Sequence, residues 1–250
     1  MICKLSIGIA LMFLAVACAN PQSSPTGPSP RHLDAEELFG SEQIISLAHA
    51  VGKSSCDEIE AAVSAGVDIN FKGYEGATLL YYAFRERKLA AFECMIRLGS
   101  DVNQYLGETP LLAIAAGRPD SAYLSALLRG GADPNLRGRS TQKPALFGAI
   151  EGGLNNISIL LDHGADPNAV VVRSESRYEV ALEGVTAPMY AAVARRVDAL
   201  LYLVENGADA CAVDSRGQSL SHYLNIWDWS RFPLDNQRIV ERLRQEIAEC

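Results

Sequence analysis

The chain has 250 residues, of which 30 are Asp or Glu and 22 are Lys or Arg, giving a formal net charge of −8. This balance disfavours nucleic-acid binding, because such binding depends on Lys and Arg side chains that neutralise phosphates. It suits a basic protein partner, although acidity also simply keeps a protein soluble. Histidines and cysteines are scattered without metal-ligand spacing, so no metal, cofactor or catalytic residue is predicted. The alternative to a protein without catalytic activity is a hydrolase with an unrecognised Cys or His site.

The first residues have the pattern of a targeting signal. Lys4 supplies one positive charge before an apolar run that is too short to span a bilayer. Leu-Ala-Val-Ala-Cys at 14–18 resembles the lipobox of bacterial lipoproteins. The resemblance implies that residues 1–17 are a signal peptide and that Cys18 is acylated. The alternative is plain secretion, in which Cys18 stays unmodified.

Residues 18–40 are predicted to be the lipidated cysteine and a tether. Four prolines stand among Ser, Gly, Thr and Gln before residue 32, and this composition cannot bury enough apolar surface to fold. Ala19 follows the cysteine, where an aspartate would resemble an inner-membrane retention signal. The resemblance therefore implies an outer-membrane lipoprotein that faces the periplasm, and a soluble periplasmic protein is the alternative.

A five-residue motif recurs along the rest of the chain. Gly-Ala-Asp-Pro-Asn stands at 131–135 and at 164–168, and looser copies contain Asp68, Asp101 and Asp209. Most copies are about 33 residues apart, and each follows an apolar run. Because glycine tolerates the left-handed φ that often follows a helix, the motif marks helix ends. A period of this size predicts stacked supersecondary units instead of one globular core.

A second signature precedes the other helix of each unit. It is clearest as Gly-Glu-Thr-Pro-Leu at 107–111, and degraded copies begin at Gly76 and Gly217. Thr or Ser can cap a new helix, and Pro in its first turn loses no needed donor. The two signatures resemble those of the ankyrin-repeat family. The resemblance implies an all-α solenoid of about six helix–turn–helix repeats, joined by β-hairpin-like loops, over residues 41–250.

The later repeats carry two further features. Residues 170–183 lengthen one loop into a predicted hairpin finger, which is either functional or a tolerated insertion. An amphipathic helix is predicted over roughly residues 234–248 as the C-terminal cap. Trp227 and Trp229 are expected to pack beneath this cap, and interface anchors are the alternative.

Two pairs of cysteines are interpreted differently. In the fold that the resemblance implies, the turn that holds Cys211 reaches the helix end that holds Cys250, so these two are predicted to form a disulfide rather than stay free. Cys56 and Cys94 fall at different heights on neighbouring second helices. We therefore expect them to be too far apart for a disulfide and to be buried as free thiols.

The resemblance implies a non-enzymatic protein that binds another protein through its loop tips and first helices. Exposed aromatic and Arg side chains most often anchor interfaces. The expected contact residues are Phe71, Tyr74, Tyr81, Tyr105, Arg137, Arg139, Arg177, Tyr178 and Arg216. Small lipidated proteins of this kind resemble immunity proteins that neutralise a secreted toxin, and an accessory partner of a periplasmic stress enzyme is the alternative. The chain is expected to be a monomer apart from its partner and to contact a membrane only through its lipid.

Overall fold

The computed structural model describes residues 33–140, 142–172 and 183–249. Its helices are α2 (Ala35–Phe39), α3 (Glu42–Lys53), α4 (Cys56–Ser64), α5 (Leu79–Arg85), α6 (Leu89–Arg97), α7 (Leu111–Ala116), α8 (Ala122–Arg129), α9 (Ala145–Gly152), α10 (Leu154–Asp162), α11 (Ala187–Val193), α12 (Val197–Glu205), α13 (Leu220–Leu224) and α14 (Leu234–Glu246). Short 3₁₀ turns lie at η2 (Tyr74–Gly76), η3 (Trp229–Arg231) and η4 (Ile247–Glu249). The two short strands are β1 (Tyr105–Leu106) and β2 (Thr109–Pro110).

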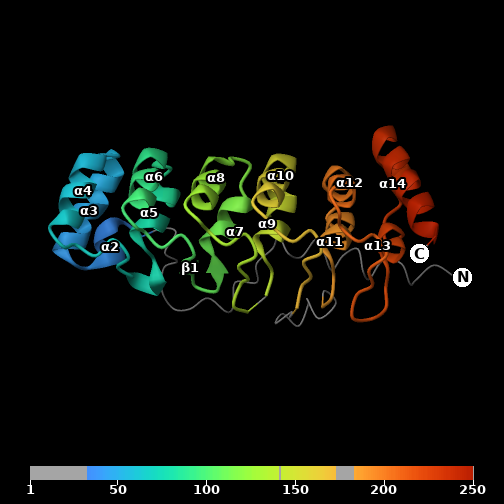
Figure 1. The fold of residues 1–250 in the computed structure, drawn as a ribbon, viewed down its shortest axis with the longest axis horizontal. Helices are drawn as coiled ribbons and strands as arrows, with labels where there is room; N and C mark the ends of the chain where they lie inside the picture. The colour runs from blue at the N-terminus through green and yellow to red at the C-terminus, as the bar shows by residue number, and fades with distance from the viewer. Residues whose placement is uncertain (1–32, 141, 173–182, 250) are drawn as a thin grey trace, which may run out of the picture.

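The helices form pairs that stack into an elongated solenoid (Figure 1). A row of second helices, α4, α6, α8, α10, α12 and α14, lies along one side, and loops project from the opposite side. The first helices α3, α5, α7, α9, α11 and α13 lie between them. In the loop before α7, β1 and β2 pair antiparallel, with Tyr105 opposite Pro110. The architecture is the predicted all-α solenoid of helix pairs joined by hairpin-like loops.

Both recurring signatures have the local roles that their residue types predict. The glycines that open the end motifs have φ between 86° and 96°, and they are Gly66, Gly99, Gly131, Gly164 and Gly207. At the helix starts, Thr78 Oγ1 accepts a hydrogen bond from the Tyr81 N–H, and Thr186 Oγ1 accepts one from the Met189 N–H. The end motif therefore stops second helices, and the start signature caps first helices.

The Asp and Asn of the end motif also join one repeat to the next. Asp133 Oδ1 accepts a hydrogen bond from the Asn135 N–H at 2.9 Å, which fixes the turn. Asn135 Oδ1 then accepts one from the Asp166 N–H of the following repeat at 2.8 Å. The same two bonds recur from Asp68 as far as Asp209. The period in the sequence thus reflects a direct contact between consecutive repeats.

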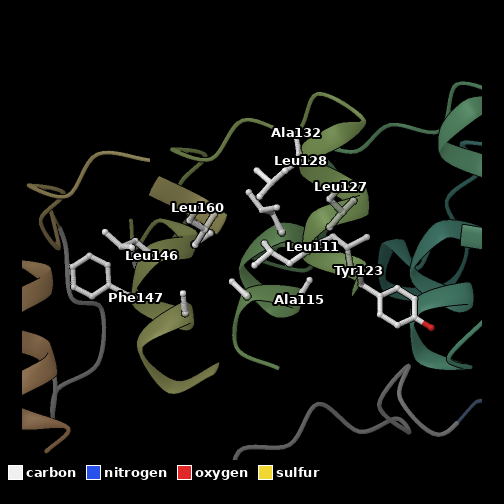
Figure 2. Packing of buried hydrophobic residues seen from close by; sticks show 14 of the residues in the cluster. Leu111, Ala115, Tyr123, Leu127, Leu128, Ala132, Leu146, Phe147 and Leu160 are labelled. Carbon is white, nitrogen blue, oxygen red and sulfur yellow. The ribbon is translucent and has the colours of Figure 1, made fainter. Parts of the chain in front are cut away.

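Buried apolar side chains from successive helix pairs form one continuous core. Figure 2 shows part of it, where Leu111 of α7, Leu127 of α8 and Leu146 of α9 are each at most 1% exposed. Small residues let first helices approach closely, since a Cβ on Gly152 would lie 2.1 Å from the Ala116 carbonyl oxygen. Burying one such Leu contributes about 1.5–3 kcal/mol. Cohesion is therefore spread along the stack, as expected of repeat proteins.

The folded part of the chain begins before the predicted boundary at residue 41. Asp34 caps α2, and Leu33 and Phe39 are buried in the core. The Leu33 carbonyl also accepts a hydrogen bond from the Arg85 guanidinium at 2.6 Å. The prediction that residues 18–40 are a tether is therefore wrong for its described part. The composition argument failed there because the apolar residues lie at the end of a Pro-rich stretch that dominated it.

Cys56 and Cys94 form a disulfide between α4 and α6. Their Cα atoms are 5.9 Å apart, within the usual range for a disulfide. The prediction of two free thiols is therefore wrong. It assumed that neighbouring second helices lie in register, whereas the first residue of α4 lies beside the sixth residue of α6. A terminal repeat has only one neighbour, so its helices are not held to the register of internal repeats.

The C-terminal cap agrees with its prediction. Helix α14 covers most of the predicted range and buries Val240 and Leu243. Trp229 is buried, and its indole N–H donates to the Leu224 carbonyl at 2.5 Å. Trp227 is half-buried and donates to the Val193 carbonyl at 3.2 Å. Both tryptophans therefore pack within the last repeats, as expected.

Cys211 replaces the Asn of the last end motif, and its N–H donates to Asp209 Oδ1 at 2.8 Å. Cys211 is disulfide-bonded, but Cys250 lies outside the described residues. The pairing of these two cysteines therefore stays a prediction. Cys18, the expected site of acylation, lies outside the described residues as well.

Candidate protein-interaction surface

The loops that precede the first helices define the tip side of the solenoid (Figure 1). Their described residues are 71–77, 104–110, 136–140 with 142–144, 169–172 with 183–186, and 212–219. The loops outside β1 and β2 are closed by the antiparallel bridges Lys72↔Thr78, Arg137↔Pro144, Val170↔Thr186 and Val213↔Ser219. The pairing of Val170 with Thr186 also closes the base of the predicted finger, whose middle lies outside the described residues. Antiparallel pairing thus closes each loop as a hairpin.

Three of the predicted contact residues, Tyr74, Arg139 and Arg216, are exposed on these tips. Tyr74 is 41% exposed in the loop before α5. Arg139 is exposed, and its guanidinium lies 4.3 Å from the centre of the Tyr105 ring of the preceding repeat. Phe71 is half-buried because its side chain packs against the core. Tyr74 and Arg139 are therefore the best placed of the predicted anchors.

Tyr105 and Arg137 hold the tips to one another. The Tyr105 hydroxyl donates to the Arg137 carbonyl of the next repeat at 2.9 Å. The Arg137 guanidinium donates to the Gln142 carbonyl at 2.7 Å and to the Val170 carbonyl of the following repeat at 2.8 Å. These contacts connect three consecutive hairpins. Both residues therefore have a structural role in the stack, and their role as partner contacts stays a prediction.

The tip of the last repeat is built around the buried carboxylate of Asp214. Asp214 Oδ2 accepts hydrogen bonds from the Tyr223 hydroxyl at 2.7 Å and from Arg216 Nη2 at 2.9 Å. Its Oδ1 accepts from the Arg216 and Gln218 N–H groups. Burial by itself would raise the pKa of Asp214, but these donors lower it to about 2. Burial and the facing carboxylate raise the pKa of Tyr223 to about 12.

Arg216 is therefore also a structural residue, although its side chain is 43% exposed. Tyr81 corrects the prediction in another way, because it is 5% exposed and cannot anchor a partner. The predicted contacts Arg177 and Tyr178 lie outside the described residues. Of the described contact residues, Tyr74, Arg139 and Arg216 are exposed, and Arg216 is also bound to the buried Asp214. Tyr105 and Arg137 join neighbouring hairpins, and Phe71 and Tyr81 pack against the core.

The exposed face of the first helices adds half-buried aromatic and aliphatic side chains. Tyr82 of α5, Ile114 of α7 and Tyr190 of α11 lie there. Tyr82 meets Phe39 edge to face at 5.9 Å, and Tyr190 meets Phe147 at 5.5 Å. Burial raises the pKa of Tyr82, and the nearby Glu86 adds to the rise. The Tyr82 and Tyr190 rings offer flat contact area beside the tips.

The turns between first and second helices, from the α3–α4 turn to the α11–α12 turn, define the turn side of the solenoid. Its cations were not predicted as site residues, and they are Arg87, Lys88, Arg118, Arg195 and Arg196. Arg87, Arg118 and Arg195 are exposed, and Lys88 is half-buried. A signal was present in the sequence, because the dibasic pairs at 87–88 and 195–196 stand at equivalent places in two repeats.

The described residues offer little for chemistry. Within residues 33–140, 142–172 and 183–249 no cluster of three or more His, Cys, Asp or Glu side chains could hold a metal ion. In the same ranges no helix is both long and apolar enough to cross a membrane. The described surface features are ones that suit contact with another macromolecule.

Comparisons with known proteins identify the fold. Residues 112–214 match the family model described as ankyrin repeats (3 copies). An ankyrin-repeat domain from Acinetobacter baumannii aligns with a TM-score of 0.63 and 21% identity, covering 81% of this chain and 97% of that one. The ankyrin-repeat domain of Bcl-3, a member of the IkappaB family, aligns with a TM-score of 0.66 and 18% identity, covering 84% and 86%.

No curated protein sequence matches the chain. Ankyrin-repeat domains typically mediate contacts between proteins and are generally binding scaffolds without catalytic activity. The helix pairs, the hairpin tips and the Asp–Asn ladder agree with these comparisons. The described part of the chain therefore has the ankyrin-repeat fold.

Proposed function

We propose that this protein is a non-enzymatic scaffold of the cell envelope that binds another protein through its tip side. The observation that carries the proposal is the row of hairpins, which present Tyr74 and the stacked pair Arg139 and Tyr105 on one side of the stack. Aromatic and Arg side chains are the commonest interface anchors. Because consecutive repeats supply them, the surface is extended, which suits a macromolecular partner better than a small molecule.

Two independent features support a location outside the cytoplasm. The sequence at 14–18 resembles a lipobox after an apolar run, so we propose an outer-membrane lipoprotein acylated at Cys18. The disulfide between Cys56 and Cys94 is the second feature. Disulfides persist in oxidising compartments such as the periplasm and are rare in the cytosol. A solenoid tethered to the membrane and facing the periplasm has both features.

The binding proposal is tested with a paired variant, Tyr74→Ala with Arg139→Ala. A matched control, Leu154→Ala with Arg129→Ala, removes an exposed apolar residue and an exposed Arg from the row of second helices. Tagged protein is purified from the envelope fraction, the bound protein is identified by mass spectrometry, and its affinity is measured with purified components. A toxin or a stress enzyme in the complex would also decide between the two partner classes that the sequence leaves open.

We expect the tip variant to bind at least about ten-fold more weakly, because interface anchors contribute about 2 kcal/mol or more. Both variants should unfold near the wild-type temperature, since exposed substitutions shift stability by less than about 0.5 kcal/mol. Equal binding by the tip variant and the control would show that the tip side is not the interface.

The location is tested on the mature N-terminus. Mass spectrometry should find lipid on Cys18, and the protein should fractionate with membranes, because a multiply acylated terminus anchors firmly. An unmodified N-terminal peptide at or just after Cys18 would contradict the lipoprotein proposal. Binding by the tip side would not be affected by that result.

A further inference from the structure

The cations of the C-terminal cap and the cations of the turn side differ in whether they form ion pairs. In the C-terminal cap every Arg from 231 to 244 forms an ion pair: Arg231, Arg238, Arg242 and Arg244. On the turn side, Arg87, Lys88, Arg118 and Arg195 form no ion pair with any carboxylate among the described residues. The turn side thus holds positive charge that the described chain does not neutralise.

The neighbouring acidic residues are engaged elsewhere. Glu86 pairs with Arg85 at 2.9 Å, and Asp198 lies 3.7 Å from Arg196. Asp120 accepts a hydrogen bond from the Ala122 N–H at the start of α8. The acids closest in sequence to the unpaired cations therefore have other contacts within the protein.

The backbone at two of these positions favours other residues. Arg87 has φ of 55° and Arg195 has φ of 59°, in the left-handed region where a side chain costs about 1 kcal/mol relative to glycine. At the corresponding turn of the repeat that contains α9, the chain has Gly153. Two arginines thus occupy equivalent turns at a local energetic cost.

The next residues are also unusual for their positions. Lys88 and Arg196 are the N-caps of α6 and α12, where Ser, Thr, Asp or Asn is preferred and the helix dipole disfavours a cation. The equivalent caps of α4 and α8 are Ser55 and Ser121. The fold therefore accommodates serine at this position, so the cap does not by itself require a cation.

Aromatic rings of adjacent repeats support two of the guanidinium groups. Arg118 lies 5.4 Å from the centre of the Phe84 ring, and Arg195 lies 4.9 Å from the Trp227 ring. A guanidinium that stacks on a ring keeps its N–H groups in its own plane, where a carboxylate can accept two of them. The stacking holds the charged group in place without consuming its donors.

We propose that the turn side binds an acidic stretch of the partner protein through Arg87, Lys88, Arg118 and Arg195. This inference rests on the proposed protein-binding function and names the chemistry of the partner. Neighbouring helix pairs are about 10 Å apart, so these turns span roughly 30 Å. The proposal opposes the expectation of a basic partner from the net charge of −8. Binding responds to the charges at the contact more than to the sum over the chain.

The test uses three labelled probes in fluorescence anisotropy: an oligoglutamate peptide, an oligolysine peptide and a single-stranded oligonucleotide. The variant Arg87→Glu with Arg118→Glu and Arg195→Glu reverses the turn side. The control Arg231→Glu with Arg238→Glu and Arg244→Glu changes the net charge equally on the C-terminal cap. A milder triple variant with Gln at positions 87, 118 and 195 covers the case in which charge reversal impairs folding.

We expect the wild-type protein and the control to bind oligoglutamate, and the reversed variant to bind it at least about ten-fold more weakly. The wild-type affinity should fall as salt is added, because exposed charges are screened. Equal affinity of the reversed variant and the control, or tighter binding of oligolysine or of the oligonucleotide, would overturn the inference.

The outcome can be separated from the fate of the proposed function. If the identified partner binds normally to the Gln triple variant but not to the tip variant, the acidic-partner inference fails and the tip-side proposal stands. If the partner loses affinity for the Gln triple variant but not for the tip variant, the turn side is supported and the tip-side proposal fails.

Discussion

The tip side and the turn side both carry arginines, but their contacts differ. On the tip side, Arg137 donates to two backbone carbonyls, and Arg216 is bound to the buried Asp214. On the turn side, Arg118 and Arg195 stack on rings and form no ion pair with the described carboxylates. An Arg in a repeat loop is therefore not by itself a sign of partner binding. What separates the two roles is whether the rest of the stack already supplies its acceptors.

The first prediction concerns the disulfide between α4 and α6, which lies on neither the tip side nor the turn side. Its contribution to stability gives a reference value for the other contacts between repeats. Cys56→Ser with Cys94→Ser removes the disulfide between residues 38 positions apart, which should lower the free energy of unfolding by about 3–4 kcal/mol. Urea unfolding under non-reducing conditions measures the loss, and binding of oligoglutamate should not change. A loss below about 1 kcal/mol would show that the first repeat is held without this bond.

The second prediction tests the structural role of the tip side. Arg137→Ala removes two charge-assisted hydrogen bonds, one within its own hairpin and one to the next hairpin, so we expect a loss of about 2–3 kcal/mol in urea unfolding. Arg139→Ala is the matched control, and its stacking on Tyr105 should contribute less than about 1 kcal/mol. Equal effects of the two substitutions would show that Arg137, which joins neighbouring hairpins, matters no more for stability than the exposed Arg139.

The third prediction uses pH to probe the other tip arginine through its carboxylate. The pKa of Asp214 falls from the ordinary 3.8 to about 2 in the folded protein, so the ionised form stabilises the fold above about pH 4. This contribution, at most about 2 kcal/mol, is lost as the pH falls from 4 towards 2. Asp214→Asn should therefore lower the free energy of unfolding at neutral pH. It should also weaken the decrease of that free energy between pH 4 and pH 2, which we call the acid limb.

The exposed Asp235 of α14 provides the control for that experiment, because its side chain is 86% exposed. Asp235→Asn should leave both the neutral stability and the acid limb close to those of the wild type. An unchanged acid limb in Asp214→Asn would mean that other carboxylates dominate acid unfolding.

The smallest expected effect concerns the backbone of the turn side. Arg87→Gly should raise the free energy of unfolding by up to about 1 kcal/mol, because φ there is 55°. Arg118→Gly is the control at a turn without positive φ, and it should lower stability by a similar amount. Both should weaken oligoglutamate binding. A destabilising Arg87→Gly would show that the arginine contributes to folding and is not retained for binding.

Sequence reasoning predicted the repeat because its cause is local and periodic. Glycine after second helices and Thr, Ser or Pro before first helices act within a few residues, so their roles could be read directly from Gly131, Thr78 and Pro110. The same reasoning failed for Tyr81, whose place in a helix gave no information about the elements that cover it. It also missed the start of the domain, because α2 is held by packing on α3 and on the repeat that contains α5.

The period, the helix pairs and their caps were thus determined by the sequence alone, since backbone conformation depends on neighbouring residues. Only the tertiary structure decided that Cys56 meets Cys94, that Arg137 joins neighbouring hairpins and that Arg118 has no ion pair with a described carboxylate. Each of these depends on the angle and spacing between one repeat and the next. Those quantities are set by packing across residues about 30 positions apart, which the identity of a single side chain does not specify.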